Sequence, residues 1–201
     1  QCPANGLRQR QLRLLQRRWP GLTLSAENGI DYRGLDESDM EALCGFGFTS
    51  FNFTLASAEG AVLEAQHRRG ETRLLAALVR RADAFGASST TYFICGLAGD
   101  TAQSVAATLA VLAGIPTRVG ISPFYPVPGL PGFEDLANRT DVSPRLCAGS
   151  SLFPWTGSLT TAELHTAFRF SRLVNLAKKR NPSLEEDALV DACFRRGRLL
   201  S

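Results

Sequence analysis

The chain has 201 residues, a formal net charge of +3 at pH 7 and 44% hydrophobic residues, which is an ordinary composition for a globular protein. So small a positive charge gives no argument for a nucleic-acid partner. No apolar run approaches the roughly 20 residues of a transmembrane helix, and no signal peptide is visible. We therefore expect a cytoplasmic protein that binds neither nucleic acid nor membrane.

The chain begins with an amphipathic pattern over residues 7–18, which predicts a helix that ends at Pro20-Gly21. The first residue is Gln1, not Met, and the chain starts beside this helix. We therefore expect a fragment, or the C-terminal part of a longer protein.

Short apolar runs alternate with helical patterns through the middle of the chain. Strands are predicted over 22–28, 51–55, 90–95 and 117–122, with the Asn28-Gly29 pair as the turn that closes the first. The helices between them are predicted from a capping box at Ser38–Glu41 and over 59–67, 72–85 and 101–113. This alternation predicts an α/β fold with a parallel sheet.

Ligands of such sheets bind at the carboxyl ends of the strands. The predicted functional edges are therefore Glu27–Gly29, Ala56-Ser57, Cys95–Asp100 and Ser122–Tyr125.

The C-terminal third begins with a segment rich in proline and glycine, from Pro126 to Pro154, which predicts a long loop. Thr160–Glu163 forms a capping box for a helix that runs to about Lys179. A second capping box at Ser183–Glu186 predicts a last helix that ends near Arg196.

The stretch Thr91–Thr101 combines a buried strand, a glycine turn and the start of a helix. Its Gly96-Leu-Ala-Gly99 turn allows the backbone to approach a flat or anionic ligand, or serves only tight packing. Ser122–Pro126 offers a hydroxyl and two rings, which fit a rim that stacks a planar ring or a packed hydrophobic lid.

The remaining candidates give no catalytic residue and no metal ligand set. Arg68 follows the second strand and could reach over its edge to a carboxylate or ribose, although an arginine is more often a surface residue. His67 and His165 lie far apart, and the five cysteines show no ligand spacing, so we expect free thiols.

Several segments together resemble radical S-adenosylmethionine (SAM) enzymes. Tyr92–Thr101 resembles their fifth-strand motif, a strand ending in GLPGxT, and Phe51–Ser57 with Arg68 resembles their fourth strand. Leu22–Gly29 resembles the third strand. The resemblance runs over nearly all of the chain.

One branch of this family also carries a cobalamin-binding domain. Ile121–Gly129 resembles the sixth-strand region of that branch, while Arg145–Ser151 and Phe168–Asn175 resemble its tail.

The resemblance implies a partial parallel (β/α) barrel, a half TIM barrel, with C-terminal helices. Residues 1–129 would form the partial barrel, 130–159 the loop and 160–201 a helical extension. It also implies a small-molecule substrate and SAM as cofactor, cleaved at a [4Fe-4S] cluster to a 5′-deoxyadenosyl radical. In this branch, cobalamin would bind to an upstream domain. The SAM-binding residues implied by the resemblance are Ser57, Arg68, Ile94, Gly96, Leu97, Gly99, Ser122, Phe124 and Tyr125.

The chain departs from the family pattern where the cluster and the methionine end of SAM bind. The CxxxCxxC cluster motif, the glycine-rich motif that follows the second strand and the cobalamin DxHxxG motif are absent. Ala56 stands where many relatives have a polar ribose contact, and Ala98 replaces the usual proline.

The leading hypothesis is therefore the C-terminal part of a radical SAM enzyme, whose cluster half lies upstream or on a partner chain, so that this chain alone is inactive. The alternative is a non-catalytic half-barrel used for binding or assembly. A TIM-barrel lyase using Arg68 is a third hypothesis, but it needs a catalytic lysine at a strand end. The only lysines, Lys178 and Lys179, lie late in a predicted helix.

Overall fold

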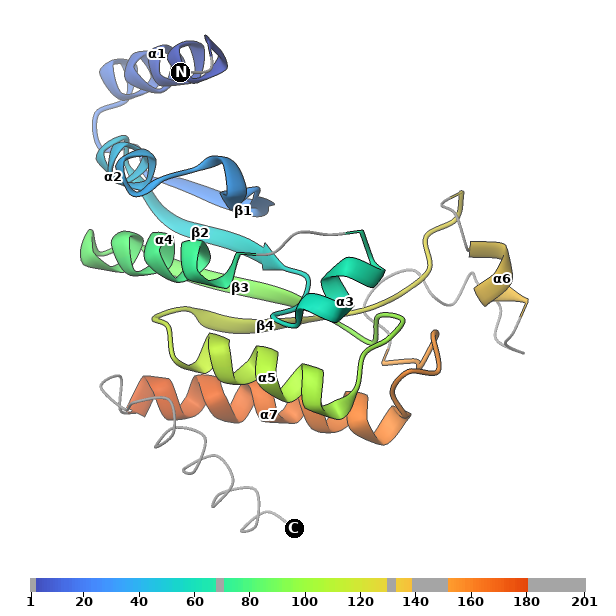
Figure 1. The fold of residues 1–201 in the computed structure, drawn as a ribbon. Coiled ribbons are helices and arrows are strands. Elements are labelled where there is room, and N and C mark those ends of the chain that lie inside the picture. The colour runs from blue at the N-terminus through green and yellow to red at the C-terminus, as the bar shows by residue number, and fades with distance from the viewer. Residues whose placement is uncertain (1–2, 68–70, 130–132, 139–151, 181–201) are drawn as a thin grey trace.

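The computed structural model describes residues 3–67, 71–129, 133–138 and 152–180 (Figure 1). Its elements in chain order are α1 Pro3–Arg18, β1 Leu24–Ile30, the 3₁₀ turn η1 Tyr32–Gly34, α2 Glu37–Gly45, β2 Phe48–Leu55, α3 Gly60–Ala65, α4 Thr72–Ala84, β3 Ser88–Cys95, α5 Ala102–Ala113, β4 Arg118–Pro123, α6 Phe133–Ala137 and α7 Thr161–Arg180. The segment Arg145–Ser151 and the helix expected after Ser183 lie outside these residues. Within the described ranges, no helix is both long and apolar enough to cross a membrane.

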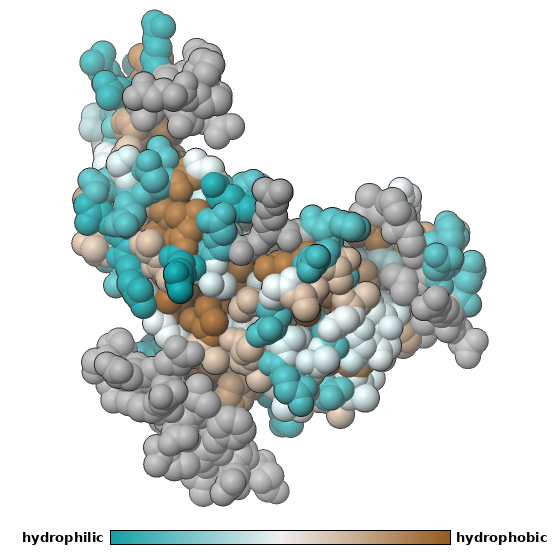
Figure 2. Space-filling view, viewed as in Figure 1, coloured by the Kyte–Doolittle hydropathy of each residue, from teal (hydrophilic) through white to brown (hydrophobic). Residues whose placement is uncertain are grey.

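The strands form one parallel sheet in the order β1-β2-β3-β4, which confirms the predicted α/β fold. Consecutive strands are neighbours, and the sheet does not close on itself, as in a segment of a (β/α) barrel. Figure 1 shows α4, α5 and α7 running alongside the strands and α1 projecting beyond β1. In the same view, hydrophilic residues cover much of the upper end of the molecule, where α1 lies (Figure 2).

The two faces of the sheet differ because side chains alternate along a strand. Phe51, Phe53 and Leu55 of β2 are fully buried in the core that the helices cover. Between them, Asn52 is half-buried and Thr54 is exposed on the opposite face. The sheet therefore has one apolar face under the helices and one open face with polar side chains.

The first strand differs from its prediction. Asn28-Gly29 does not end the strand, since β1 continues to Ile30. Its pairing with β2 shifts register between Ala26 and Ile30, and Gly29 adopts a φ of +81°. The pair therefore forms an irregularity inside the strand, for which glycine is suited because it lacks a Cβ.

The start of α2 also differs from its prediction. The N-cap is Asp36, not Ser38, because the Asp36 carboxylate accepts the Asp39 N–H at 2.9 Å and the Asp39 carboxylate accepts the Asp36 N–H at 3.1 Å. An aspartate pair thus makes the capping box, and the Ser38 hydroxyl donates to Asp36 at 2.7 Å.

Two polar side chains attach helix α7 to β4 and to the segment that precedes β4. The Asn175 amide accepts the Val119 N–H and donates to the Val119 carbonyl, both at 2.8 Å, as a neighbouring strand would. Lys178 Nζ donates to the carbonyls of Leu112, Ile115 and Thr117 at the end of α5 and in the loop that follows. These contacts fix α7 along the outer edge of the sheet.

We expect Lys178→Met to lower the free energy of unfolding by about 1–3 kcal/mol, because it leaves three carbonyls without their donor. Lys179→Met is the matched control, since Lys179 is exposed, and it should change stability by less than about 0.5 kcal/mol. Urea denaturation followed by circular dichroism measures both. Equal stability of the two variants would show that the Lys178 contacts contribute nothing.

The same residue predicts a pH dependence. Burial lowers the pKa of Lys178 from 10.5 to about 8 in the folded chain. Between these two pH values the unfolded chain binds the proton and the folded chain does not, so this group makes stability rise with pH. The stability difference between wild type and Lys178→Met should therefore grow from pH 8 to pH 10. A constant difference would contradict the lowered pKa of Lys178.

Candidate functional site at the carboxyl ends of the strands

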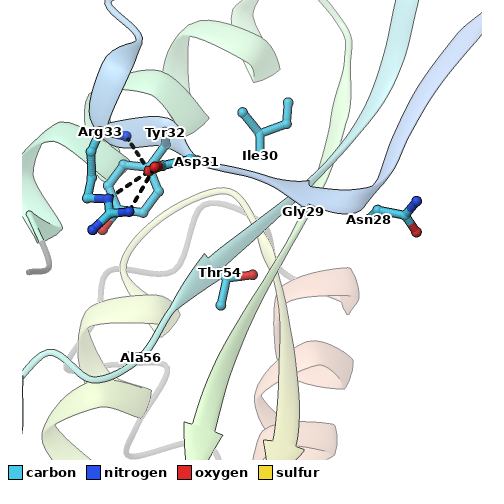
Figure 3. Close-up of a pocket in the computed structure, with 8 residues that line it drawn as sticks. All are labelled: Asn28, Gly29, Ile30, Asp31, Tyr32, Arg33, Thr54 and Ala56. Atoms are coloured by element: carbon cyan, nitrogen blue, oxygen red, sulfur yellow. Dashed lines mark hydrogen bonds and ion pairs between the residues drawn. The ribbon is translucent and has the colours of Figure 1, made fainter. Parts of the chain in front are cut away.

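The carboxyl ends of β1 and β2 line a cavity of about 230 Å³ (Figure 3). The sequence predicted functional edges at these two places, and the structure brings Asn28, Gly29 and Ala56 together around one cavity. Figure 3 shows Thr54 on β2 facing this space and Asn28 turned to the side. The lining combines polar side chains, such as Asn28 and Thr54, with the apolar Ile30 and Ala56.

One ion pair lies at the rim of this cavity. Arg33 Nε donates to Asp31 Oδ1 at 2.7 Å, and a terminal nitrogen of the same guanidinium donates to Oδ2 at 2.8 Å (Figure 3). This hydrogen bond from Arg33 lowers the pKa of Asp31 below its usual value. The two charges neutralise each other, so the described residues of the lining offer no free cation to an anionic ligand.

The glycine turn after β3 is held by a buried carboxylate. Asp100 Oδ2 accepts the N–H groups of Gly96 and Leu97, both at 2.9 Å, and Oδ1 accepts the Ser104 hydroxyl at 3.1 Å. Gly96 and Gly99 adopt φ values of +93° and +88°, which explains why glycine occupies both positions. Burial raises the pKa of Asp100, while these hydrogen bonds act in the opposite direction. The two amides are therefore not available to an anion.

A distant loop fastens onto this turn. Thr156 Oγ1 donates to the Gly96 carbonyl at 2.9 Å, and the Gly99 N–H donates to Ser158 Oγ at 3.0 Å. A Cβ on Gly96 would lie 3.3 Å from Leu164 of α7, so the packing there is already close. The sequence analysis missed these contacts because nothing in the sequence pairs a glycine turn with hydroxyls about sixty residues later.

The loop also carries a polar atom without a partner. Trp155 is 3% exposed, and its indole Nε1 is buried with no hydrogen-bond acceptor among the described residues. Its ring packs against Phe153 at 4.8 Å between centroids. Trp155 therefore contributes mainly by filling space beneath the loop.

Four of the predicted contacts lie near one another where β3 and β4 end. Ile94 and Ser122 are paired in register and both are half-buried. The Phe124 N–H donates to the Cys95 carbonyl at 2.8 Å, which places the ring-bearing segment directly beyond the sheet. Tyr125 is 39% exposed. We call this group, Ile94, Ser122, Phe124 and Tyr125, the β3–β4 rim.

The other predicted contacts are placed differently. Ser57 is 2% exposed, and its hydroxyl accepts the Glu59 N–H at 3.1 Å and contacts Thr108 Oγ1 at 3.5 Å. Leu97 is 3% exposed, whereas Gly99 is exposed. Arg68 lies outside the described residues. Ser57 and Leu97 therefore support the edge from beneath.

The open face carries an aromatic ring in an unusual position. Tyr92 of β3 leans across Gly120, its register partner on β4, and remains 37% exposed. A Cβ on Gly120 would lie within 3.0 Å of Cγ of the ring and closer still to Cδ1 and Cε1. Gly120 thus lets an exposed ring lie against the strand, next to the rim.

The described residues contain no group of three or more histidine, cysteine, aspartate or glutamate side chains able to hold a metal ion. The Cys95 thiol is in the core under the helices, and burial raises its pKa to about 12. Burial also raises the pKa of Cys44. Neither is a ready thiolate, so these residues do not fit an iron–sulfur cluster.

We expect Gly120→Ala to lower the free energy of unfolding by about 1–3 kcal/mol, because the new methyl group displaces the Tyr92 ring. In a Tyr92→Ala background, Gly120→Ala should lower the free energy of unfolding much less, since the Tyr92 ring is no longer there to be displaced. A double-mutant cycle by urea denaturation measures the coupling. Additive effects would show that the ring does not lie on Gly120.

The fold is similar to that of solved radical SAM enzymes. Coproporphyrinogen III oxidase (HemN) from Escherichia coli superposes with a TM-score of 0.53 and 21% identity, over 79% of this chain and 36% of the other. The methyltransferase TsrM from Kitasatospora setae, with tryptophan and a SAM analogue bound, gives 0.57 and 16%, over 79% and 39%. TsrM with cobalamin and a [4Fe-4S] cluster gives 0.54 and 16%, over 74% and 31%.

No family model matches the sequence, and no curated protein matches it. The chain spans less than two fifths of the length of each of these solved enzymes. The likeness therefore concerns the fold: the described residues form an unclosed parallel sheet with helices that is similar to part of each of these enzymes.

Proposed function

We propose that this chain is the C-terminal part of a radical SAM catalytic domain and that its β3–β4 rim contacts the adenosine end of SAM. The observation that carries the proposal is the unclosed sheet of consecutive parallel strands, which superposes on radical SAM enzymes over most of the chain. The rim supports it, because half-buried Ile94 and Ser122 lie beside an exposed tyrosine at the strand ends, where ligands of such sheets bind.

The residues fit one end of SAM and not the other. An adenine ring needs an apolar surface and a few polar groups, which Ile94, Phe124 and Ser122 of the rim offer. Ser57 and Leu97 hold that edge from below, while Gly99 and Arg68 remain proposed contacts. Since the described residues offer no ligands for the cluster, the proposal assigns the cluster, the chemistry of SAM cleavage and any cobalamin to other residues.

The proposal therefore requires a second half, upstream in the same polypeptide or on a partner chain. The two edge strands of the sheet differ in their pairing, and this difference suggests where the second half attaches. The backbone of Val119 on β4 is already paired with Asn175, whereas β1 pairs only with β2 in the described part of the chain. Leu14 and Trp19, before β1, are 56% and 54% exposed. We propose that the missing strands pair with β1 and that this apolar surface is covered there.

The open face of the sheet is the proposed side for a small-molecule substrate. Asn52, Thr54 and Tyr92 offer hydrogen-bonding groups and a ring on that face. We also propose a cytoplasmic location, because Cys44 and Cys95 are free thiols.

A non-catalytic half-barrel is the second candidate function. The observation that favours it is the lack of a metal-binding group among the described residues, together with Ala56 at the end of β2. To separate the two, the full reading frame and this chain alone are reconstituted anaerobically with iron and sulfide. We expect cluster absorbance and release of 5′-deoxyadenosine only from the full protein. A full protein that binds no cluster would support the binding module.

We expect Tyr125→Ala to weaken SAM binding by about three- to tenfold in the full protein, because an exposed ring at the rim is lost. Val127→Ala is the matched control, since Val127 is 41% exposed on the same loop, compared with 39% for Tyr125. Isothermal titration calorimetry with SAM measures both. An equal effect of the two substitutions would contradict a contact by Tyr125.

A further inference from the structure

A second cavity, of about 810 Å³, lies at the opposite end of the sheet from the candidate site. It is lined by the first residues of β3 and β4, by the loop from Gly114 to Thr117 and by the last turns of α7. Its volume is within the range of small-molecule sites. The cavity lies at the amino ends of β3 and β4, whereas the β3–β4 rim lies at their carboxyl ends. A strand of six residues is roughly 20 Å long, so the two sites are distinct.

Positive charge dominates the lining of this cavity. Arg118 begins β4, and Arg172, Lys178 and Lys179 project from α7, whereas Asp83 is the only acidic residue among the described residues of the lining. Arg118 and Lys179 are exposed and form no ion pair among the described residues. Such a local excess of cations attracts anions more strongly than the net charge of the chain suggests.

The other two cations are fixed in place. The Arg172 guanidinium lies 4.7 Å from the centroid of the Phe168 ring. Lys178 Nζ is held by the carbonyls of Ile115 and Thr117 at 2.9 and 2.8 Å and by that of Leu112. One wall therefore presents positioned charges, while Arg118 and Lys179 are free to bind a ligand.

The cavity walls are also well supported. Asn175 holds α7 to the backbone of Val119, and Ser89 Oγ donates to the Pro116 carbonyl at 3.4 Å. The cavity is thus formed between elements that are bonded to one another. A guanidinium and an ammonium on such walls suit a ligand with several anionic oxygens, because Arg pairs with oxyanions through two parallel hydrogen bonds.

We propose that this cavity is a second binding site, for a small molecule that carries a diphosphate or polyphosphate group. Arg118 and Lys179 bind the phosphate oxygens, and the rest of the ligand lies against the apolar wall made by Ile115, Pro116 and Leu176. The ligand is either a free diphosphate or a nucleotide that carries one, and the two share the same phosphate contacts.

The test titrates the full chain with pyrophosphate, ATP, sulfate or citrate at low ionic strength, in separate calorimetric runs without SAM. We expect saturable binding of pyrophosphate or ATP. ATP binding at least about fivefold tighter than pyrophosphate identifies a nucleotide as the ligand, and equal affinity identifies the diphosphate alone. Citrate binding as tightly as pyrophosphate would overturn the phosphate assignment, and no binding by either phosphate compound would overturn the site.

Variants locate the binding. Arg118→Ala and Lys179→Ala should each weaken binding at least about fivefold, since each removes a charge-assisted contact. Arg118→Lys keeps the positive charge but not the two parallel hydrogen bonds, so it should weaken binding less than Arg118→Ala does. Arg80→Ala, an exposed arginine of α4 outside the lining, is the charge-matched control and should change little. An equal loss in Arg80→Ala would mean diffuse attraction to the basic surface and would reject the cavity. Circular dichroism confirms that each variant is folded.

Discussion

The Asp100 carboxylate fixes the turn after β3, and the shape of the candidate site depends on this one side chain. It is 4% exposed and accepts two backbone N–H groups and one hydroxyl, which satisfy a carboxylate that would otherwise be costly to bury. Next to it, Thr101 and Ser104 form the capping box that starts α5. The turn, the helix start and the strand end are therefore one hydrogen-bonded unit.

This arrangement restricts how the site can recognise a ligand. With the amides of Gly96 and Leu97 bonded to Asp100, and those of Gly99 and Phe124 bonded to Ser158 and Cys95, little backbone donor capacity remains at the end of β3. Recognition must come from side chains and from the exposed backbone edge. The two glycines allow the positive φ values of the turn, and Gly96 also packs against Leu164, while a ligand contact by either glycine stays a prediction.

What could be read from the sequence was local. Short apolar runs that alternate with helical patterns predicted all four strands, and Thr160–Glu163 predicted the start of α7, where Glu163 accepts the Thr160 N–H at 2.7 Å. Those signals lie within a few residues of one another. By contrast, the contacts of Thr156 and Ser158 with the glycine turn, and of Tyr92 with Gly120, depend on strand register and on loops that meet only after folding.

Neighbouring residues can also give competing local signals, which explains the wrong predictions for the start of α2 and the end of β1. Both Asp36 and Ser38 are good N-caps, and the structure uses Asp36 because its partner three residues later is Asp39. Asn28-Gly29 is a strong turn signal, yet β1 continues through it because Ile30 still pairs with Phe53 of β2. Tertiary pairing decided a choice that the sequence left open.

Charged side chains have different partners at the two ends of the sheet, and helix dipoles explain only part of this difference. At the carboxyl end, Asp31 is paired with Arg33, and Asp100 is fully hydrogen-bonded. At the amino end, Lys178 caps the carbonyls that end α5, where a cation is stabilised by the helix dipole. Arg118 begins a strand and has no such role. Its guanidinium has no ion-pair partner among the described residues, so it is available to the ligand that we propose for this cavity.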